Sequence, residues 1–259
     1  KEYTDLITRY AADAAAGNNL ALCLTYLRNM PRALEEMRHV VSILPKRALY
    51  RVNLALYADY AGDFPNGERE ARATVEPGVF GMMALAFAQL GQGQLPQASD
   101  TYQALGKIDA QGASYAASGL GDLALYQGRF SDAARLFAQG ADADVKSKDT
   151  DRAARKFAAL AYAQLLRQQK GGAIAAADRA LANSQAVQIR FLAARTFVDA
   201  GSTAKAQMLA AGLASEFQAE PNAYAKIIEG ELALKAKDAR QAIKALTDAN
   251  MLLDTWMGH

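Results

Sequence analysis

One stretch of sequence decides the fold class of this chain, Gly128-Arg129-Phe130-Ser131-Asp132-Ala133-Ala134-Arg135-Leu136-Phe137. A glycine is followed five positions later by an alanine, and four positions after that by a side chain that can face a core. The same order of residue types recurs over Gly93–Tyr102 and Gly201–Ala210. A unit that returns about every 35 residues points to a repeat protein built from helix pairs.

Two small residues mark each of seven successive units. The later marker of each unit is Ala33, Gly67, Ala98, Ala133, Ala173, Ala206 or Ala242. Twelve positions earlier stand Ala21, Ala55, Ala86, Gly121, Ala161, Ala194 and Gly230. Two antiparallel helices approach closely only where the side chains at their crossing are small. The spacing therefore predicts two helices in each unit, joined by a tight turn.

The turn between the two helices is predicted to be left-handed where it holds glycine, because that backbone costs glycine little. These glycines are Gly62, Gly93, Gly128 and Gly201. Arg28, Gln168 and Lys237 stand at the same place in the other three units, so we expect another geometry there. The longest step, from Ala133 to Ala173, predicts a longer helix end or a polar loop.

Composition supports a helical, globular chain. Alanine supplies 58 of the 259 residues, and 51% of the residues are hydrophobic, which excludes disorder. The net charge of +2 lacks the basic excess of a nucleic-acid binder. No run of 18 apolar residues is present, so we expect no membrane insertion. The lone Cys23 is predicted to be a buried structural thiol.

The repeat resembles the tetratricopeptide repeat (TPR) family, whose signature is W-x2-L-G-x2-Y, then A-x3-F, then P. The best match is Leu120-Gly121 followed by Ala133 and Phe137, although Ala124 replaces the tyrosine and no unit has the tryptophan. The resemblance implies an all-α, right-handed superhelical solenoid of antiparallel helix pairs. It would contain about seven repeats and roughly 14–16 helices.

A narrower resemblance is to the TPR tails of bacterial serine/threonine protein kinases. It rests on the segments Asn53–Tyr57, Tyr60–Phe64 and Gly230–Leu246. This resemblance implies that the chain is part of a larger signalling or regulatory protein, and that a kinase domain is left out. The cytoplasm is then slightly favoured for a soluble chain, and the periplasm is the alternative if the kinase is membrane-anchored.

Three segments are expected along the chain. Residues 1–16 would form an N-terminal capping helix or the remnant of an earlier repeat, ended by Gly17-Asn18-Asn19. Residues 17–250 would form the solenoid, and residues 251–259 would start a further, truncated helix. An open solenoid end exposes apolar faces, so it could support homo-oligomers.

The binding surface is placed by the resemblance, because the first helix of each TPR pair lines a concave groove. Helical spacing then selects Leu56, Phe80, Met83, Phe87, Tyr115, Asp122, Arg155, Tyr162, Phe191, Arg195, Tyr224 and Glu231, and the resemblance adds Asn53. The first half of this set is apolar, and the second mixes tyrosine with charge. Asn53 matches one asparagine of the family's carboxylate clamp, but no lysine accompanies it, so no clamp is predicted.

Signals for catalysis are thin. The histidines are only His39 and His259, and no phosphate-binding or nucleophile motif is present, so we predict no catalytic residue, cofactor or metal. The leading hypothesis is a non-catalytic scaffold that binds a peptide or protein segment in the concave groove. The alternatives are a structural spacer or self-association module, and an all-helical toroid enzyme.

Overall fold

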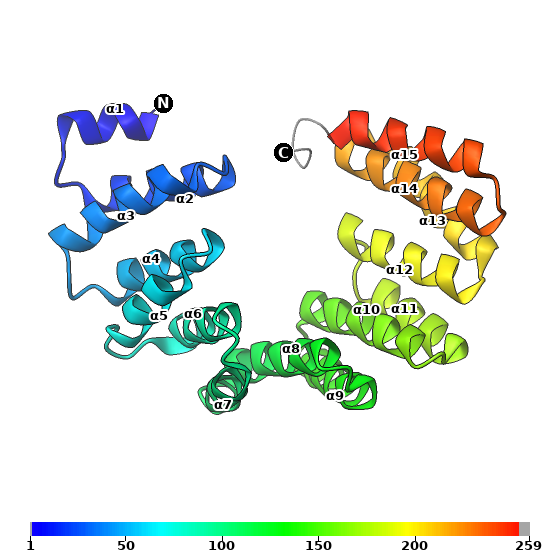
Figure 1. The fold of residues 1–259 in the computed structure, drawn as a ribbon, viewed down its shortest axis with the longest axis horizontal. Helices are drawn as coiled ribbons and strands as arrows, with labels where there is room; N and C mark the ends of the chain where they lie inside the picture. Colours follow the sequence, from blue (N-terminus) through cyan, green and yellow to red (C-terminus); the bar gives the residue numbers. More distant parts are fainter. Residues whose placement is uncertain (1, 254–259) are drawn as a thin grey trace. The chain divides into compact units, whose positions relative to one another are not determined.

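The computed structural model describes residues 2–253, which form fifteen α-helices and no strand (Figure 1). Helix α1 (Glu2–Arg9) precedes seven helix pairs. The first helices are α2 (Ala14–Tyr26), α4 (Ala48–Tyr60), α6 (Gly78–Gly91), α8 (Ala110–Tyr126), α10 (Thr150–Leu166), α12 (Val187–Ala200) and α14 (Ala219–Lys235). The second helices are α3 (Met30–Ile43), α5 (Phe64–Arg72), α7 (Leu95–Leu105), α9 (Phe130–Lys146), α11 (Lys170–Asn183), α13 (Thr203–Ala214) and α15 (Ala239–Leu253). The all-α prediction is confirmed.

The chain divides into two compact units, Lys1–Leu120 (unit 1) and Gly121–His259 (unit 2), with the boundary inside α8. In unit 1, α2 packs on α3, α4 on α5 and α6 on α7, and α4 also packs on α6. In unit 2, every helix from α9 to α15 packs on the next, and α12 packs on both α10 and α14. Each unit is therefore a stack of helix pairs whose first helices touch, as in a solenoid.

The small residues lie at the helix crossings, as the spacing predicts. Each later marker is the fourth residue of a second helix, and all fourteen small residues are buried. A Cβ atom added to Gly121 would lie 2.4 Å from the ring of Phe137, and one added to Gly230 would lie 2.8 Å from Leu246. Larger side chains at these places would separate the helices.

The prediction of a different turn geometry at Arg28, Gln168 and Lys237 is wrong. Their φ angles are 57°, 59° and 61°, in the left-handed region that the four glycines also occupy. The same hydrogen bond closes the glycine and non-glycine turns, as in Asn29 N–H to the Leu24 carbonyl at 2.9 Å. This bond satisfies a carbonyl at the helix end, which offsets a cost of about 1–2 kcal/mol for a side chain at positive φ.

The helix bounds differ from the sequence expectation at the N-terminus. Gly17-Asn18-Asn19, expected to end a helix, lies inside α2. Gly17 serves packing instead, because a Cβ there would lie 2.7 Å from a methyl group of Val40 on α3. Cys23 is exposed rather than buried, because it lies off the side of α2 that carries Leu20, Ala21 and Leu24 into the core.

The long step between Ala133 and Ala173 is a longer helix end. Both α9 and α10 have 17 residues, and the Asp149 side chain caps α10 by accepting from the Arg152 amide at 3.1 Å. At the C-terminus, α15 runs to Leu253, and residues 254–259 of the expected further helix lie outside the described residues. Among residues 2–253, no helix is long and apolar enough to cross a membrane.

Each unit has a buried aspartate, and the two differ in whether a cation lies beside the carboxylate. In unit 2, Asp144 and Lys156 are both buried and form an ion pair of 2.5 Å between α9 and α10. In unit 1, Asp59 on α4 is buried, and neither carboxyl oxygen has a hydrogen-bond partner. Desolvation raises the pKa of Asp59 to about 7. Gly67 leaves the space for this carboxyl, since an added Cβ would lie 2.0 Å from Oδ1.

Candidate functional site

All thirteen residues selected from the sequence lie on first helices, and none is buried in a core. Their helices are α4 for Asn53 and Leu56, α6 for Phe80, Met83 and Phe87, α8 for Tyr115 and Asp122, α10 for Arg155 and Tyr162, α12 for Phe191 and Arg195, and α14 for Tyr224 and Glu231. We call the solvent-facing side of the first helices within each unit its first-helix face.

The first-helix face of unit 1 contains a cavity of about 680 Å³ between α2, α4 and the start of α6. None of its fourteen lining residues is charged. Three residues from the predicted set line it, Asn53, Leu56 and Phe80. The other lining residues are Leu22, Thr25, Tyr26, Ala48, Leu49, Val52, Tyr57, Tyr60, Pro77, Gly78 and Val79. We call this site the unit 1 cavity.

Large side chains of the unit 1 cavity are open to solvent. Tyr26 is 74% exposed, Tyr60 60%, Leu49 53% and Phe80 50%. Burial raises the pKa values of Tyr57 and Tyr60, and the Asp59 charge adds to the effect on Tyr60. The phenols therefore stay neutral at physiological pH, where each combines an apolar ring with a hydroxyl that can donate or accept.

The Asn53 side chain is fixed by a hydrogen bond to a neighbouring helix. Its side-chain Nδ2 donates to Asn18 Oδ1 at 2.8 Å, which links α4 to α2. Phe80 contacts Tyr115 with ring centroids 6.1 Å apart, and Met83 and Tyr115 pack against the core around Tyr102 and Leu105. Phe87 is half-buried on α6.

In unit 2, four predicted residues form one cluster between α12 and α14. The rings of Phe191 and Tyr224 stack at 4.1 Å with an interplanar angle of 11°. Arg195 lies 5.7 Å from the Phe191 ring centroid, and its Nε donates to Glu231 at 2.7 Å. Tyr224 donates to Glu220 at 2.9 Å, and desolvation with this bond raises the Tyr224 pKa to about 12.

The remaining predicted residues stand outside this cluster. Asp122 and Arg155 are exposed on α8 and α10. Tyr162, 54% exposed, lines a separate cavity of about 450 Å³ with Leu165, Leu166, Gln168, Lys170 and Asp199. The structure thus brings together four residues in unit 2 and three in the unit 1 cavity.

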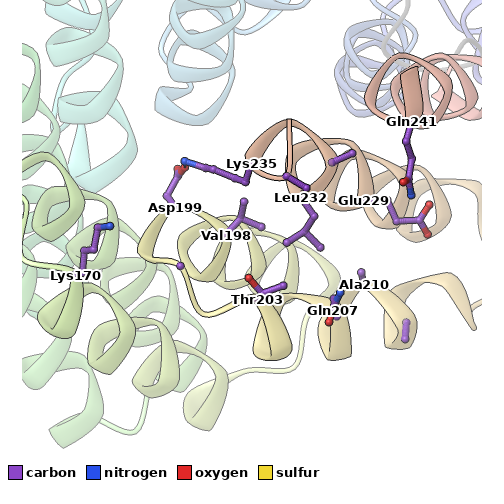
Figure 2. Close-up of a pocket in the computed structure, with 14 residues that line it drawn as sticks. Lys170, Val198, Asp199, Thr203, Gln207, Ala210, Glu229, Leu232, Lys235 and Gln241 are labelled. Atoms are coloured by element: carbon purple, nitrogen blue, oxygen red, sulfur yellow. The ribbon is translucent and has the colours of Figure 1, made fainter. Parts of the chain in front are cut away.

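A further cavity of about 700 Å³ lies in unit 2, between the ends of α12 and α14 and the start of α13 (Figure 2). Its polar lining residues include Lys170, Asp199, Gln207, Glu229, Lys235 and Gln241. None of the thirteen predicted residues lines it. We call it the edge cavity of unit 2.

A register signal could have found several of the missed lining residues. The position seven before each later marker falls in the last turn of each first helix, and the residue there is exposed in all seven helix pairs. The residues there are Tyr26, Tyr60, Gly91, Tyr126, Leu166, Asp199 and Lys235. We call them the helix-end row. Sequence reasoning followed the middle of the first helices and passed over this row.

None of the three cavities is lined by a set of described side chains suited to covalent chemistry. Among residues 2–253, no group of three or more His, Cys, Asp or Glu side chains is arranged to hold a metal. His39 lines none of these cavities and contacts the Ala11 carbonyl at 3.1 Å. What the sites offer is contact area with polar positions at the rim, which suits recognition of a partner.

Comparison with known proteins gives the fold family. No protein-family model matches the sequence, and no curated protein sequence matches it. The apo form of RapI is 10% identical with a TM-score of 0.60, over 94% of this chain and 99% of that chain. PilW, a type IV pilus biogenesis factor, is 15% identical with a TM-score of 0.59, over 86% of this chain and 98% of that chain.

A third similar structure is that of a TPR protein. It is the C-terminal part of a TPR repeat-containing protein from Cytophaga hutchinsonii, 13% identical with a TM-score of 0.51. The match covers 92% of this chain and 95% of that chain. At these identities the likeness shows the fold alone, a TPR-like helical solenoid. The narrower resemblance to kinase tails stays a prediction.

Proposed function

We propose that this chain is a non-catalytic interaction scaffold that binds a segment of a partner protein in the unit 1 cavity. One observation carries the proposal: an uncharged cavity of about 680 Å³ whose large apolar and tyrosine side chains face solvent. Apolar side chains grouped in this way on a surface mark interaction sites, and tyrosine supplies contact area at low entropic cost.

The lining defines the segment that fits. A charged side chain entering the cavity would lose hydration with no charged residue to pair it, so the buried part of the segment must be apolar. The hydroxyl groups of Tyr26 and Tyr60 and the amide of Asn53 can bond to the segment's backbone. The bond between Asn53 and Asn18 holds α4 against α2 before binding, which reduces the ordering cost.

The first test captures the partner at the cavity. The photoreactive residue p-benzoylphenylalanine replaces Phe80 in one variant and Tyr126 in a matched variant. Tyr126 belongs to the same helix-end row as Tyr26 and Tyr60 and is 79% exposed, but does not line the cavity. We expect a partner to be cross-linked from Phe80 and not from Tyr126, and mass spectrometry then identifies the cross-linked segment.

The second test measures affinity for that segment as a synthetic peptide. The double variant Tyr26→Ser/Tyr60→Ser removes two exposed rings from the cavity wall, so its affinity should fall at least tenfold, whereas Tyr126→Ser should bind as the unaltered chain does. Equal binding by all three proteins in fluorescence anisotropy would refute the cavity assignment.

A second proposal is self-association through α15, which is favoured by its exposed apolar side chains. Ile243 is 67% exposed and Met251 65%, and Leu246 is also exposed. A dimer would bury this side of the last helix. Sedimentation velocity should then show a dimer that Ile243→Glu converts to a monomer, while a monomer at every concentration would refute it.

The larger context is also a proposal. A place as the docking part of a signalling protein, such as the tail of a bacterial kinase, is supported by the segments Asn53–Tyr57, Tyr60–Phe64 and Gly230–Leu246. The full reading frame tests it directly, because a kinase domain on the same chain is the expected finding.

A further inference from the structure

The edge cavity of unit 2 has an apolar floor and a charged rim. Val198, Leu232 and small side chains of α13 and α14 form the floor. Figure 2 shows Lys235 reaching over to Asp199 on one side of Leu232, and Glu229 with Gln241 on the other. The Lys235–Asp199 ion pair is 2.9 Å long. A ligand in this cavity would meet aliphatic surface below and charge at both ends.

This cavity adjoins a second one. Lys170 and Asp199 line both the edge cavity of about 700 Å³ and the cavity of about 450 Å³ beside Tyr162. The two together offer a track along the helix-end row, past Leu166, Asp199 and Lys235. A track of this form suits an extended peptide better than a compact small molecule.

Two lysines and two carboxylates line the track, so its formal charges balance, but one lysine is unpaired because Glu229 pairs with Lys226 from outside the lining. Both carboxylates of the edge cavity are paired with lysines, Asp199 with Lys235 and Glu229 with Lys226, the second pair at 2.7 Å. Lys170 makes no ion pair or hydrogen bond among residues 2–253, so its positive charge is the unpaired one. Lys170 is also the first residue of α11, where the helix dipole disfavours a cation.

Polar groups without partners line the same cavity. The side chains of Thr203, Gln207 and Gln241 line the cavity and form no hydrogen bond among residues 2–253. A side-chain amide donates and accepts at once, which matches the alternating N–H and C=O groups of an extended backbone. These residues can therefore hold a peptide backbone while the floor takes its side chains.

We propose that the edge cavity of unit 2 is a second binding site, which takes an extended peptide with an internal Asp or Glu close to an aliphatic side chain. The peptide carboxylate pairs with Lys170, and the aliphatic side chain rests on Val198 and Leu232. This site is separate from the unit 1 cavity and requires a charged ligand, which the unit 1 cavity excludes.

The test begins with the full chain and a random dodecapeptide library fused through its C-terminus to a phage coat protein. That fusion leaves no free terminal carboxylate, so any acidic preference comes from side chains. We expect enriched peptides to carry Asp or Glu within about two residues of Leu, Ile or Val, a spacing that places both side chains on one stretch of extended chain. Failure to enrich any acidic peptide, in selections against the unaltered chain and against Tyr26→Ser/Tyr60→Ser, would overturn the proposal.

An enriched peptide, synthesised with an amidated C-terminus, is then measured against three proteins. Lys170→Glu should weaken binding at least tenfold, and the peptide with Lys in place of its acidic residue should bind Lys170→Glu more tightly than it binds the unaltered chain. Lys107→Glu, a matched change at an exposed lysine of unit 1, should bind the original peptide normally. Equal binding by both variants would overturn the assignment.

Folding does not confound this test. Glutamate at the first position of α11 suits the helix dipole, so Lys170→Glu should melt no lower than the unaltered chain. Ala211→Trp, at an exposed lining position, fills the cavity without changing its charge and should also abolish binding. Loss of binding in Tyr26→Ser/Tyr60→Ser but not in Lys170→Glu would place the peptide in the unit 1 cavity and refute the second site alone.

Discussion

The two units share one helix-pair architecture but organise their polar groups in opposite ways. In the helix-end row, unit 1 carries Tyr26 and Tyr60 and no charge, whereas the row of unit 2 begins with Tyr126 and Leu166 and ends in the Asp199–Lys235 ion pair. In the interior, unit 1 leaves Asp59 without a partner, whereas unit 2 pairs Asp144 with Lys156. The repeat sets where a side chain lies, and the residue type at that place sets what the site can bind.

The first-helix faces differ in the same direction. Unit 1 has an open, uncharged cavity. In unit 2 the side chains of this face already contact one another, because Phe191 stacks on Tyr224 and Arg195 pairs with Glu231. A surface whose groups are already paired must break contacts to bind a ligand, and an open apolar cavity need not. This difference favours unit 1 as the location of the proposed docking site.

The largest effect on stability is expected when the buried aspartate of unit 2 loses its cation and becomes unpaired, like Asp59 of unit 1. Lys156→Met leaves Asp144 buried without its cation, which should reduce the free energy of unfolding by about 3–5 kcal/mol. Urea unfolding followed by circular dichroism measures the loss. The double variant Asp144→Leu/Lys156→Met should recover most of it, and a single variant as stable as the unaltered chain would show that the pair contributes nothing.

The reverse change in unit 1 should stabilise the protein. Because burial raises the pKa of Asp59 to about 7, the unfolded chain loses this proton near its ordinary pKa of 3.8 while the folded chain keeps it. Stability from this group is therefore full below pH 4 and is lost as the pH rises toward 7. Asp59→Asn, which imitates the neutral acid, should raise the free energy of unfolding at pH 8 by up to about 4 kcal/mol.

The matched measurement for Asp59→Asn is at low pH. Near pH 3.5, Asp59 is neutral in the folded and largely neutral in the unfolded chain, so the variant and the unaltered chain should unfold at similar urea concentrations. A gain of the same size at both pH values would mean that the carboxyl charge is not its cause.

An exchange within the helix-end row tests the chemistry of the two cavities. Tyr60→Lys places a charge of the unit 2 type in the unit 1 cavity, and should weaken binding of an apolar segment by about 1.4 kcal/mol, or tenfold. Because Tyr60 is exposed, the melting temperature should change little. Calorimetry with the segment captured at Phe80 measures this, and unchanged affinity would show that charge in the cavity is tolerated.

The smallest effect is expected on the first-helix face of unit 2. The Arg195–Glu231 pair is partly exposed, with side-chain exposures of 49% and 23%, so Arg195→Ala should cost no more than about 1 kcal/mol of stability. A double-mutant cycle with Glu231→Ala isolates the pair energy. A coupling above about 2 kcal/mol would instead indicate a surface held rigidly for binding.

The helix pairs could be predicted from the sequence, because close helix crossings admit only small residues. Ala33 and Ala21 mark the first pair twelve positions apart, and the same spacing marks the other six. The left-handed turn at Arg28 could not be predicted from the sequence, because an arginine alone disfavours positive φ. The hydrogen bonds that close the helix end offset this backbone cost, and they form only in the folded chain. Asn18 looked like a helix breaker for a similar reason, although it bonds to Asn53 of the next pair.

For the candidate sites, the sequence predicted where the residues lie but not which of them interact. Helical spacing places Phe80, Arg195 and Tyr224 on first helices and outside the core. It does not reveal that Arg195 reaches Glu231, 36 positions later, or that Lys170 makes no ion pair with any residue between 2 and 253. Side-chain pairing depends on the distance between neighbouring helices, which no single helix determines.

The sequence by itself determined the helix-pair repeat, because the crossing residues and the helical period are properties of the local chain. Only the tertiary structure decided which exposed side chains enclose a cavity, which charges are paired, and which carboxyl is buried alone. Those outcomes depend on how closely adjacent pairs pack, and small differences in packing decide whether Asp59 stays unpaired while Asp144 finds Lys156.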